Sequence, residues 1–194
     1  MPSSSLQPLP GGTHAFVVAA REHAMRRLLF HTLSSDERGE GDGPNHHEEE
    51  TEAAVLSQAM ISRPALVVLD VELVAGDGLR ACARLKADPL TCHTAVVVVS
   101  SSYDRDDFDG AVAAGADAFL VKPFSPLRLR AIAEELCGEA QARAARASSA
   151  LPAVPGTAAY EAHPERYDLP PVLREGGRAD QARDEAASAT RLAG

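Results

Sequence analysis

The sequence feature that most constrains the fold is an unbroken apolar run, between Pro64 and Asp70, that ends in one carboxylate. Five consecutive apolar residues, rich in valine and leucine, follow the proline. A short apolar run bounded by turn signals is typical of a strand that is buried on both faces. Because ligands of open α/β sheets bind outside the carboxyl ends of such strands, Asp70 is a candidate site residue. The competing interpretation is a carboxylate that only caps the following turn.

Similar apolar runs occur elsewhere and alternate with helical patterns. Three further strands are predicted, at residues 14–20, 95–100 and 118–121. Apolar residues spaced three and four apart predict helices between and after the strands. These helices are expected at residues 25–33, 52–62, 79–86, 103–114 and 126–138. Regular alternation of strand and helix predicts an α/β fold with a parallel sheet.

The segment 34–50 breaks this pattern, because it contains no large apolar residue and three of its residues are glycines. We expect a polar, solvated loop at this place. The pair His46-His47 lies among glutamates and could be considered as a metal site. No further ligands follow at helical or hairpin spacing, and the sequence therefore favours a charged loop.

Both ends of the chain differ in composition from the segment between them. Residues 1–11 are rich in serine, proline and glycine and are expected to be flexible. Residues 139–194 are rich in alanine and proline and lack a periodic apolar face, which predicts a disordered tail. One island in this tail, Tyr160 with residues 167–173, is either a short docking peptide or a spacer with scattered apolar residues.

Charge and cysteine content exclude several classes of function. A net charge of −9 and a pI near 5.2 argue against sequence-independent binding to nucleic acid or to an anionic membrane. The three cysteines form no CxxC motif, so the sequence predicts neither a disulfide framework nor a zinc site. With no signal sequence and no long apolar stretch, a cytoplasmic location is expected.

Right-handed crossovers place the carboxyl ends of all predicted strands on one rim of the sheet. Asp70, Ser100 and Lys122 each end a predicted strand and would meet there. A carboxylate, a hydroxyl and an ammonium group can together hold a phosphoryl group, with the aspartate as nucleophile. The chemistry expected from this combination is acyl phosphate formation.

Residues 12–138 resemble the receiver domain of two-component response regulators. The stretch Gly115-Ala116-Asp117-Ala118-Phe119-Leu120-Val121-Lys122-Pro123-Phe124 carries the most specific part of the resemblance. The spacing from Asp70 to Asp77-Gly78 and the pair Ser100-Ser101 agree with it. The resemblance implies a flavodoxin-like three-layer sandwich with strand order 2-1-3-4-5. It also implies four roles: phosphoacceptor for Asp70, conserved lysine for Lys122, switch hydroxyl for Ser100 and aromatic switch for Phe119.

The sequence departs from the family pattern in its metal ligands. Receiver domains place two adjacent acids after the first strand to bind magnesium, and Ala19-Ala20 stand at these positions. The sequence therefore predicts impaired Mg²⁺ binding, with Asp70 and Glu72 as the remaining candidate ligands. Glu72 matches a position that lends a backbone carbonyl in the family. Alternatively, Arg21 replaces the cation through a salt bridge to Asp70, or it points into solvent. The second strand, in the region of residues 34–50, could be lost because it lies at the sheet edge.

The resemblance implies a stand-alone signalling module without enzymatic activity, because no output domain follows the last predicted helix. Its expected partners are a histidine kinase or phosphotransfer protein, a downstream protein and a second copy of the chain. Ala19-Ala20 favour a pseudo-receiver in which Mg²⁺-dependent phosphorylation of Asp70 is impaired. The alternative is a haloacid-dehalogenase-like phosphatase, with Asp70 as nucleophile and Glu72 as general acid and base.

Overall fold

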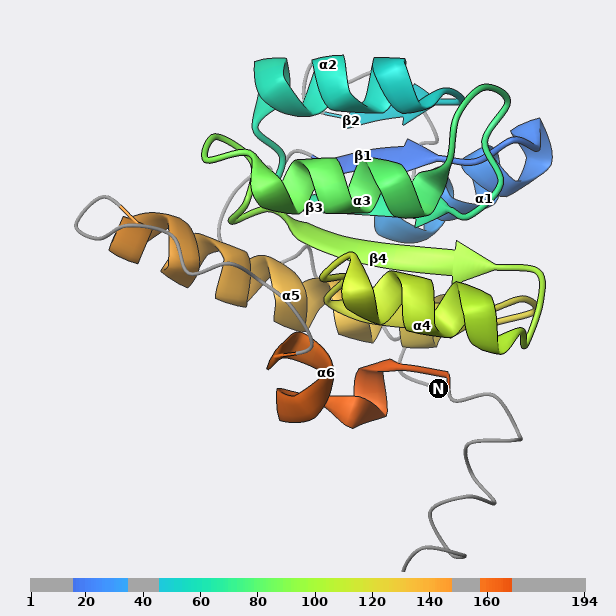
Figure 1. Ribbon diagram of the computed structural model, residues 1–194. Helices are drawn as coiled ribbons and strands as arrows, with labels where there is room; N and C mark the ends of the chain where they lie inside the picture. The colour runs from blue at the N-terminus through green and yellow to red at the C-terminus, as the bar shows by residue number, and fades with distance from the viewer. Residues whose placement is uncertain (1–15, 35–45, 148–157, 169–194) are drawn as a thin grey trace, which may run out of the picture.

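The protein is a three-layer α/β sandwich built on a five-stranded parallel sheet (Figure 1). The structure, a computed structural model, describes residues 16–34, 46–147 and 158–168. The strand order is β2-β1-β3-β4-β5, which confirms the predicted flavodoxin-like order. The strands are β1 (Phe16–Ala19), β2 (His46–Glu49), β3 (Leu66–Asp70), β4 (Ala95–Ser100) and β5 (Ala118–Val121).

Two groups of helices cover the two faces of the sheet. In Figure 1, α2, α3 and α4 lie in front of the sheet, and α1 and α5 lie behind it. The helices are α1 (His23–Leu33), α2 (Glu52–Ser62), α3 (Gly78–Ala87), α4 (Arg105–Ala113), α5 (Pro126–Ala147) and α6 (Ala158–Ala162), with a short 3-10 helix η1 at Pro164–Arg166. None of the helices among the described residues is long and apolar enough to cross a membrane.

The continuous apolar runs are explained by burial on both faces. Successive side chains of a strand point to opposite sides of the sheet. Along β3, Leu66 and Val68 pack in the core beneath α1 and α5, whereas Val67 and Leu69 pack in the core beneath α2, α3 and α4. Strands covered in this way need apolar residues at every position, which is the pattern that the sequence shows.

The polar segment 34–50 contains a strand, so the expectation of a loop and a lost second strand is wrong for its last part. His46–Glu49 forms β2 and pairs with β1 alone, at the edge of the sheet. An edge strand has one free side, which allows polar side chains that a central strand would exclude. Arg26 and Arg27 of α1 lie 4.0 and 3.8 Å from the Glu48 carboxylate. Residues 35–45 lie outside the described part of the chain.

Two described parts of the chain beyond residue 138, residues 139–147 and 158–168, are more ordered than their composition predicts. Helix α5 continues to Ala147, and residues 158–168, here called the strap, pack against the sheet edge opposite β2. For these residues the prediction of a disordered tail is wrong, because Tyr167 packs into the core on the face of the sheet that α2, α3 and α4 cover. The predicted flexible N-terminus and residues 169–194 lie outside the described residues.

Candidate functional site

The carboxyl ends of the three strands β3, β4 and β5 bring the predicted site residues to one rim. Asp70 is the last residue of β3, Ser100 is the last residue of β4, and Lys122 follows β5 directly. The registers Asp70↔Val99 and Ser100↔Val121 hold the strand ends level with one another. The rim lies at the end toward which the arrowheads in Figure 1 point.

Asp70 is held by one cation and one backbone amide. The Lys122 ammonium donates to Asp70 Oδ2 at 2.5 Å, and the Glu72 N–H donates to Asp70 Oδ1 at 3.2 Å. Burial raises the pKa of Asp70 above its ordinary value, and the hydrogen bond and charge of Lys122 offset this effect only in part. The carboxylate is therefore a buried group at the end of a strand, held in one orientation by Lys122 and the Glu72 amide.

A close backbone contact fixes the loop after Asp70. A Cβ atom at Gly78 would lie 2.0 Å from the Asp70 carbonyl oxygen, so only glycine fits at the start of α3. Asp77 caps this helix, with its side chain accepting hydrogen bonds from the Leu79 and Arg80 amides. The spacing from Asp70 to Asp77-Gly78 in the sequence thus reflects a turn that packs against the site.

Ser100 reaches the rim but its hydroxyl engages α4. Ser100 Oγ donates to Asp107 Oδ2 at 2.6 Å and accepts from the Ser102 N–H at 3.0 Å. The neighbouring Ser101 hydroxyl lies 3.5 Å from Lys122 Nζ. In the described state Asp107 thus holds the predicted switch hydroxyl, a contact that the sequence pattern did not indicate.

Phe119, the predicted aromatic switch, is fully buried inside the sandwich. Its ring forms an edge-to-face contact with Phe108 of α4, with 5.8 Å between the ring centroids. The same core contains Tyr167 of the strap. The aromatic ring therefore connects β5 to α4 and to the strap, and its role as a switch stays a prediction.

The end of β1, where the sequence predicted that two acids are missing, is buried and held by backbone hydrogen bonds. Ala19 and Ala20 are fully buried at the end of β1 and have no side-chain oxygen. The Glu72 carbonyl, which the family offers to the metal, accepts the Arg21 N–H at 3.3 Å. The exposed Arg21 side chain lies 3.9 Å from the Glu72 carboxylate, and its only ion pair in the described structure is with Glu72 rather than Asp70.

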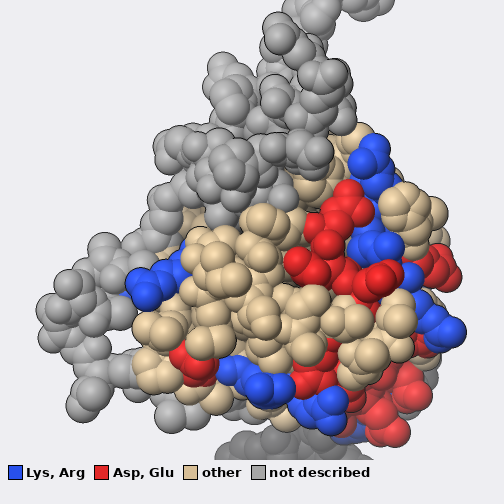
Figure 2. Space-filling model, turned by 90° about the horizontal axis from the view of Figure 1, so that it is seen from above, with Lys and Arg blue, Asp and Glu red and all other residues tan. Residues whose placement is uncertain are grey.

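A different arginine, Arg26 of α1, lies beside the end of β1. Its guanidinium donates to the Ala20 carbonyl at 2.7 Å and to the Arg21 carbonyl at 3.1 Å, and lies 3.3 Å from the Glu50 carboxylate. In Figure 2, acidic and basic side chains lie side by side toward this end of the molecule. Sequence reasoning missed Arg26 because one arginine on an amphipathic helix is indistinguishable from a surface residue.

These residues do not fit the magnesium ion that the family resemblance implies. Hard divalent cations need several oxygen ligands, and carboxylates supply most of the charge. The described residues contain no cluster of three or more histidine, cysteine or acidic side chains that could hold a metal. In the described structure, the ion pair of Asp70 is with Lys122, and the Glu72 carbonyl is paired with an amide.

Comparison with known proteins identifies the family. The profile of the response regulator receiver domain matches residues 22–134, more than half of the chain. The chain belongs to the response regulator receiver domain family. The matched residues of the receiver domain begin after β1 and therefore after Ala19 and Ala20.

Curated relatives of the receiver domain are longer proteins. The KDP operon transcriptional regulatory protein KdpE of Escherichia coli (strain K12) is 34% identical over 115 residues, which cover 59% of this chain and 47% of KdpE. Response regulator PleD of Caulobacter vibrioides (strain NA1000 / CB15N) is 35% identical over 74 residues, which cover 38% of this chain and 16% of PleD. The receiver domain thus spans less than half the length of these relatives. Because KdpE is by name a transcriptional regulator, the comparison gives no support to the expected absence of nucleic-acid binding.

Solved structures agree on the fold. The CheY-like response regulator receiver domain protein from Methanospirillum hungatei JF-1 has a TM-score of 0.56 and 18% sequence identity, and the match covers 66% of this chain and 96% of that chain. At this identity the likeness concerns the fold alone.

Proposed function

We propose that this receiver domain is a pseudo-receiver, which transmits signals through protein contacts without Mg²⁺-dependent phosphorylation of Asp70. The observation that supports the proposal is the pair Ala19 and Ala20, two buried alanines at the end of β1, where the resemblance to receiver domains leads us to expect the magnesium-binding acids. A divalent ion normally supplies several kcal/mol of charge stabilisation during transfer to a carboxylate. Lys122 is then the remaining cation in contact with Asp70 among the described residues.

The partners that we propose are proteins of a two-component pathway. A histidine kinase or phosphotransfer protein would dock at the rim around Asp70, and a downstream protein would read the state of the domain. For a pseudo-receiver, these contacts depend on the geometry of the Asp70–Lys122 pair and not on a phosphoryl group. A second copy of the chain is a further partner within this proposal.

Intact-mass measurement after incubation with acetyl phosphate and Mg²⁺ tests the proposal. We expect no mass gain for the wild-type chain and a gain of one phosphoryl group for the Ala20→Asp variant, which adds a carboxylate directly after β1, one residue beyond the Ala19↔Leu69 pair as Asp70 is. The same variant with Asp70→Asn is the matched control and should gain nothing. A phosphoryl group on the wild-type chain that disappears in Asp70→Asn would refute the pseudo-receiver.

We further propose that the protein is not a phosphatase. The haloacid-dehalogenase mechanism needs an acid two residues after the nucleophile to transfer a proton at the site. Glu72 occupies this position, but its side chain is exposed and lies next to Arg21. Incubation with a generic phosphate ester should release no phosphate above the level of Asp70→Asn. Turnover that depends on both Asp70 and Glu72 would support the enzyme instead.

A further inference from the structure

The strap occupies the outer edge of β5. The Asp168 N–H donates to the Phe119 carbonyl at 2.7 Å, and Asp168 Oδ2 accepts the Val121 N–H at 2.8 Å. Tyr167 pairs with Phe119 as in a parallel bridge. An edge strand presents unpaired N–H and C=O groups to which another extended segment can add. The strap satisfies these groups from within the same chain.

Aromatic packing anchors the strap beneath α4. Tyr167 is buried and its hydroxyl donates to the Ala116 carbonyl. Its ring lies 5.2 Å from that of Tyr160 and 6.2 Å from that of Phe108, measured between centroids, and both contacts are edge-to-face. Tyrosine with a partnered hydroxyl combines large buried area with a directed polar contact. These contacts therefore favour an aromatic residue with a hydroxyl group at this position.

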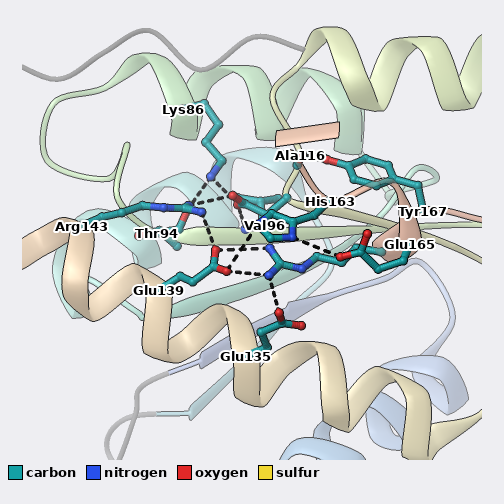
Figure 3. A network of polar contacts seen from close by, with 12 residues as sticks. Lys86, Thr94, Val96, Ala116, Glu135, Glu139, Arg143, His163, Glu165 and Tyr167 are labelled. Atoms are coloured by element: carbon teal, nitrogen blue, oxygen red, sulfur yellow. Dashed lines mark hydrogen bonds and ion pairs between the residues drawn. The ribbon is translucent and has the colours of Figure 1, made fainter. Parts of the chain in front are cut away.

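The residues on either side of Tyr167 form ion pairs with charged side chains of α5. Arg166 donates to Glu135 at 2.7 Å and to Glu139 at 2.5 Å, while Asp168 pairs with Arg128. Figure 3 shows Glu135 and Glu139 projecting from α5 toward the strap. The surface thus matches a basic residue, an aromatic residue and an acid in sequence.

We propose that the outer edge of β5, together with α4 and α5, is a binding site for an Arg-Tyr-Asp segment whose tyrosine and aspartate lie extended along the strand. The chain's own strap closes this site and acts as an intramolecular competitor of a segment offered in trans. Because the strap and β5 belong to the same chain, a segment offered in trans competes with an intramolecular contact. Arg166 Nε is buried without an acceptor among the described residues, so the docked strap leaves one polar group unsatisfied.

The site lies next to the rim chemistry without depending on it. Asp168 accepts a hydrogen bond from the Val121 amide. Val121 directly precedes Lys122, and the Lys122 ammonium contacts Asp70. Closing the edge with the strap thus fixes the backbone that presents Lys122. The proposal goes beyond the pseudo-receiver function and holds whether or not Asp70 accepts a phosphoryl group.

Amide hydrogen exchange and peptide binding, both measured by NMR on the full chain, test the proposal. In Tyr167→Ala and Asp168→Ala, we expect the Val121 amide to exchange at least about tenfold faster, because its acceptor is released. Amides of β3, whose partners lie inside the sheet, should exchange as in the wild-type protein, which separates strap release from unfolding. Tyr103→Ala, which removes an exposed tyrosine outside the strap, is the matched control and should leave Val121 protected.

A synthetic peptide of residues 158–168 is the probe for binding in trans. It should shift the β5 amides of Asp168→Ala and bind the wild-type chain at least about tenfold more weakly, because the tethered strap competes. Unchanged Val121 exchange in both strap variants, or equal peptide binding to wild type and variant, would overturn the proposal. Loss of Val121 protection in wild type on dilution, together with loss of a dimer, would show that a second copy supplies the segment and would also overturn it.

Discussion

The buried pair of Lys86 and Asp117 gives the sharpest test of how this domain is held together. Lys86 Nζ lies 2.5 Å from Asp117 Oδ2 and 2.8 Å from the Thr94 carbonyl, and the side chains of Lys86 and Asp117 are 4% and 3% exposed. Asp117 also accepts the Val96 N–H at 2.8 Å and the Arg143 guanidinium at 2.7 Å. Burial acts to raise the pKa of Asp117, but Lys86 and Arg143 outweigh it and hold this pKa below its ordinary value.

Replacing Lys86 by methionine should lower the free energy of unfolding by about 3 kcal/mol. Breaking a buried ion pair costs roughly 3 to 5 kcal/mol, because one charge stays buried without its partner. The lower end applies here since Asp117 keeps Arg143 and the Val96 N–H. With a urea m-value of about 2 to 3 kcal/mol/M, the midpoint of unfolding should fall by about 1 to 1.5 M. Circular dichroism and tyrosine fluorescence together measure this shift.

The double variant Lys86→Met/Asp117→Asn decides whether the buried charge is the cause. Asparagine still accepts the Val96 N–H, so the double variant should be more stable than either single variant. Arg105→Met, which breaks an exposed pair with Asp109, is the control and should change the stability by less than about 1 kcal/mol. A double variant that loses the sum of the two single effects would refute the reasoning.

Three further outcomes are expected. The Arg166 hydrogen bond lowers the pKa of Glu139 below its ordinary value. The stabilisation by this pair is therefore complete above the pKa of the unfolded state and is lost as the pH falls through the pKa of the folded state. Urea titrations between about pH 6 and 3 should show a smaller loss of stability for Glu139→Gln than for the wild type. Glu52→Gln, which weakens the contacts with Arg80 and Arg84, should lower the unfolding free energy by about 1 to 3 kcal/mol in urea. Asp107→Ala should release the Ser100 hydroxyl and move the Ser102 amide resonance, whereas an unchanged resonance would contradict the Asp107 contact.

The central strands and the sheet rim were predictable because strands buried on both faces require continuous apolar runs in the sequence. Residues of β3 and β4 are covered on both faces and must be apolar throughout, so the point where the run stops marks the sheet rim. Asp70, Ser100 and Lys122 were found in this way, and the structure places all three at strand ends. Their signalling roles stay predictions.

The edges of the sheet were not predictable from local sequence. Strand β2 pairs with one neighbour only, so its polar residues carry no apolar signature. The strap contacts β5 through Asp168 and Val121, which are 47 positions apart in the chain. Because β5 contributes main-chain atoms to this contact, its side chains do not indicate the contact in the sequence. Tyr160, Arg166 and Tyr167 follow no helical or strand periodicity, so the sequence alone does not distinguish them from a spacer.

The pairing of each lysine with an aspartate gives the domain a chemical reporter of its own state. Lys86 and Lys122 are the two lysines of the sequence. The other permanently cationic side chains are arginines. Lys86 is 4% exposed, whereas Lys122 at the rim is 17% exposed. Apart from the terminal amine, an amine-reactive reagent therefore has one accessible target, and its labelling rate measures how firmly Asp70 holds Lys122. Any partner that docks over the rim or loosens this pair would change that rate, so binding can be followed without altering a single residue.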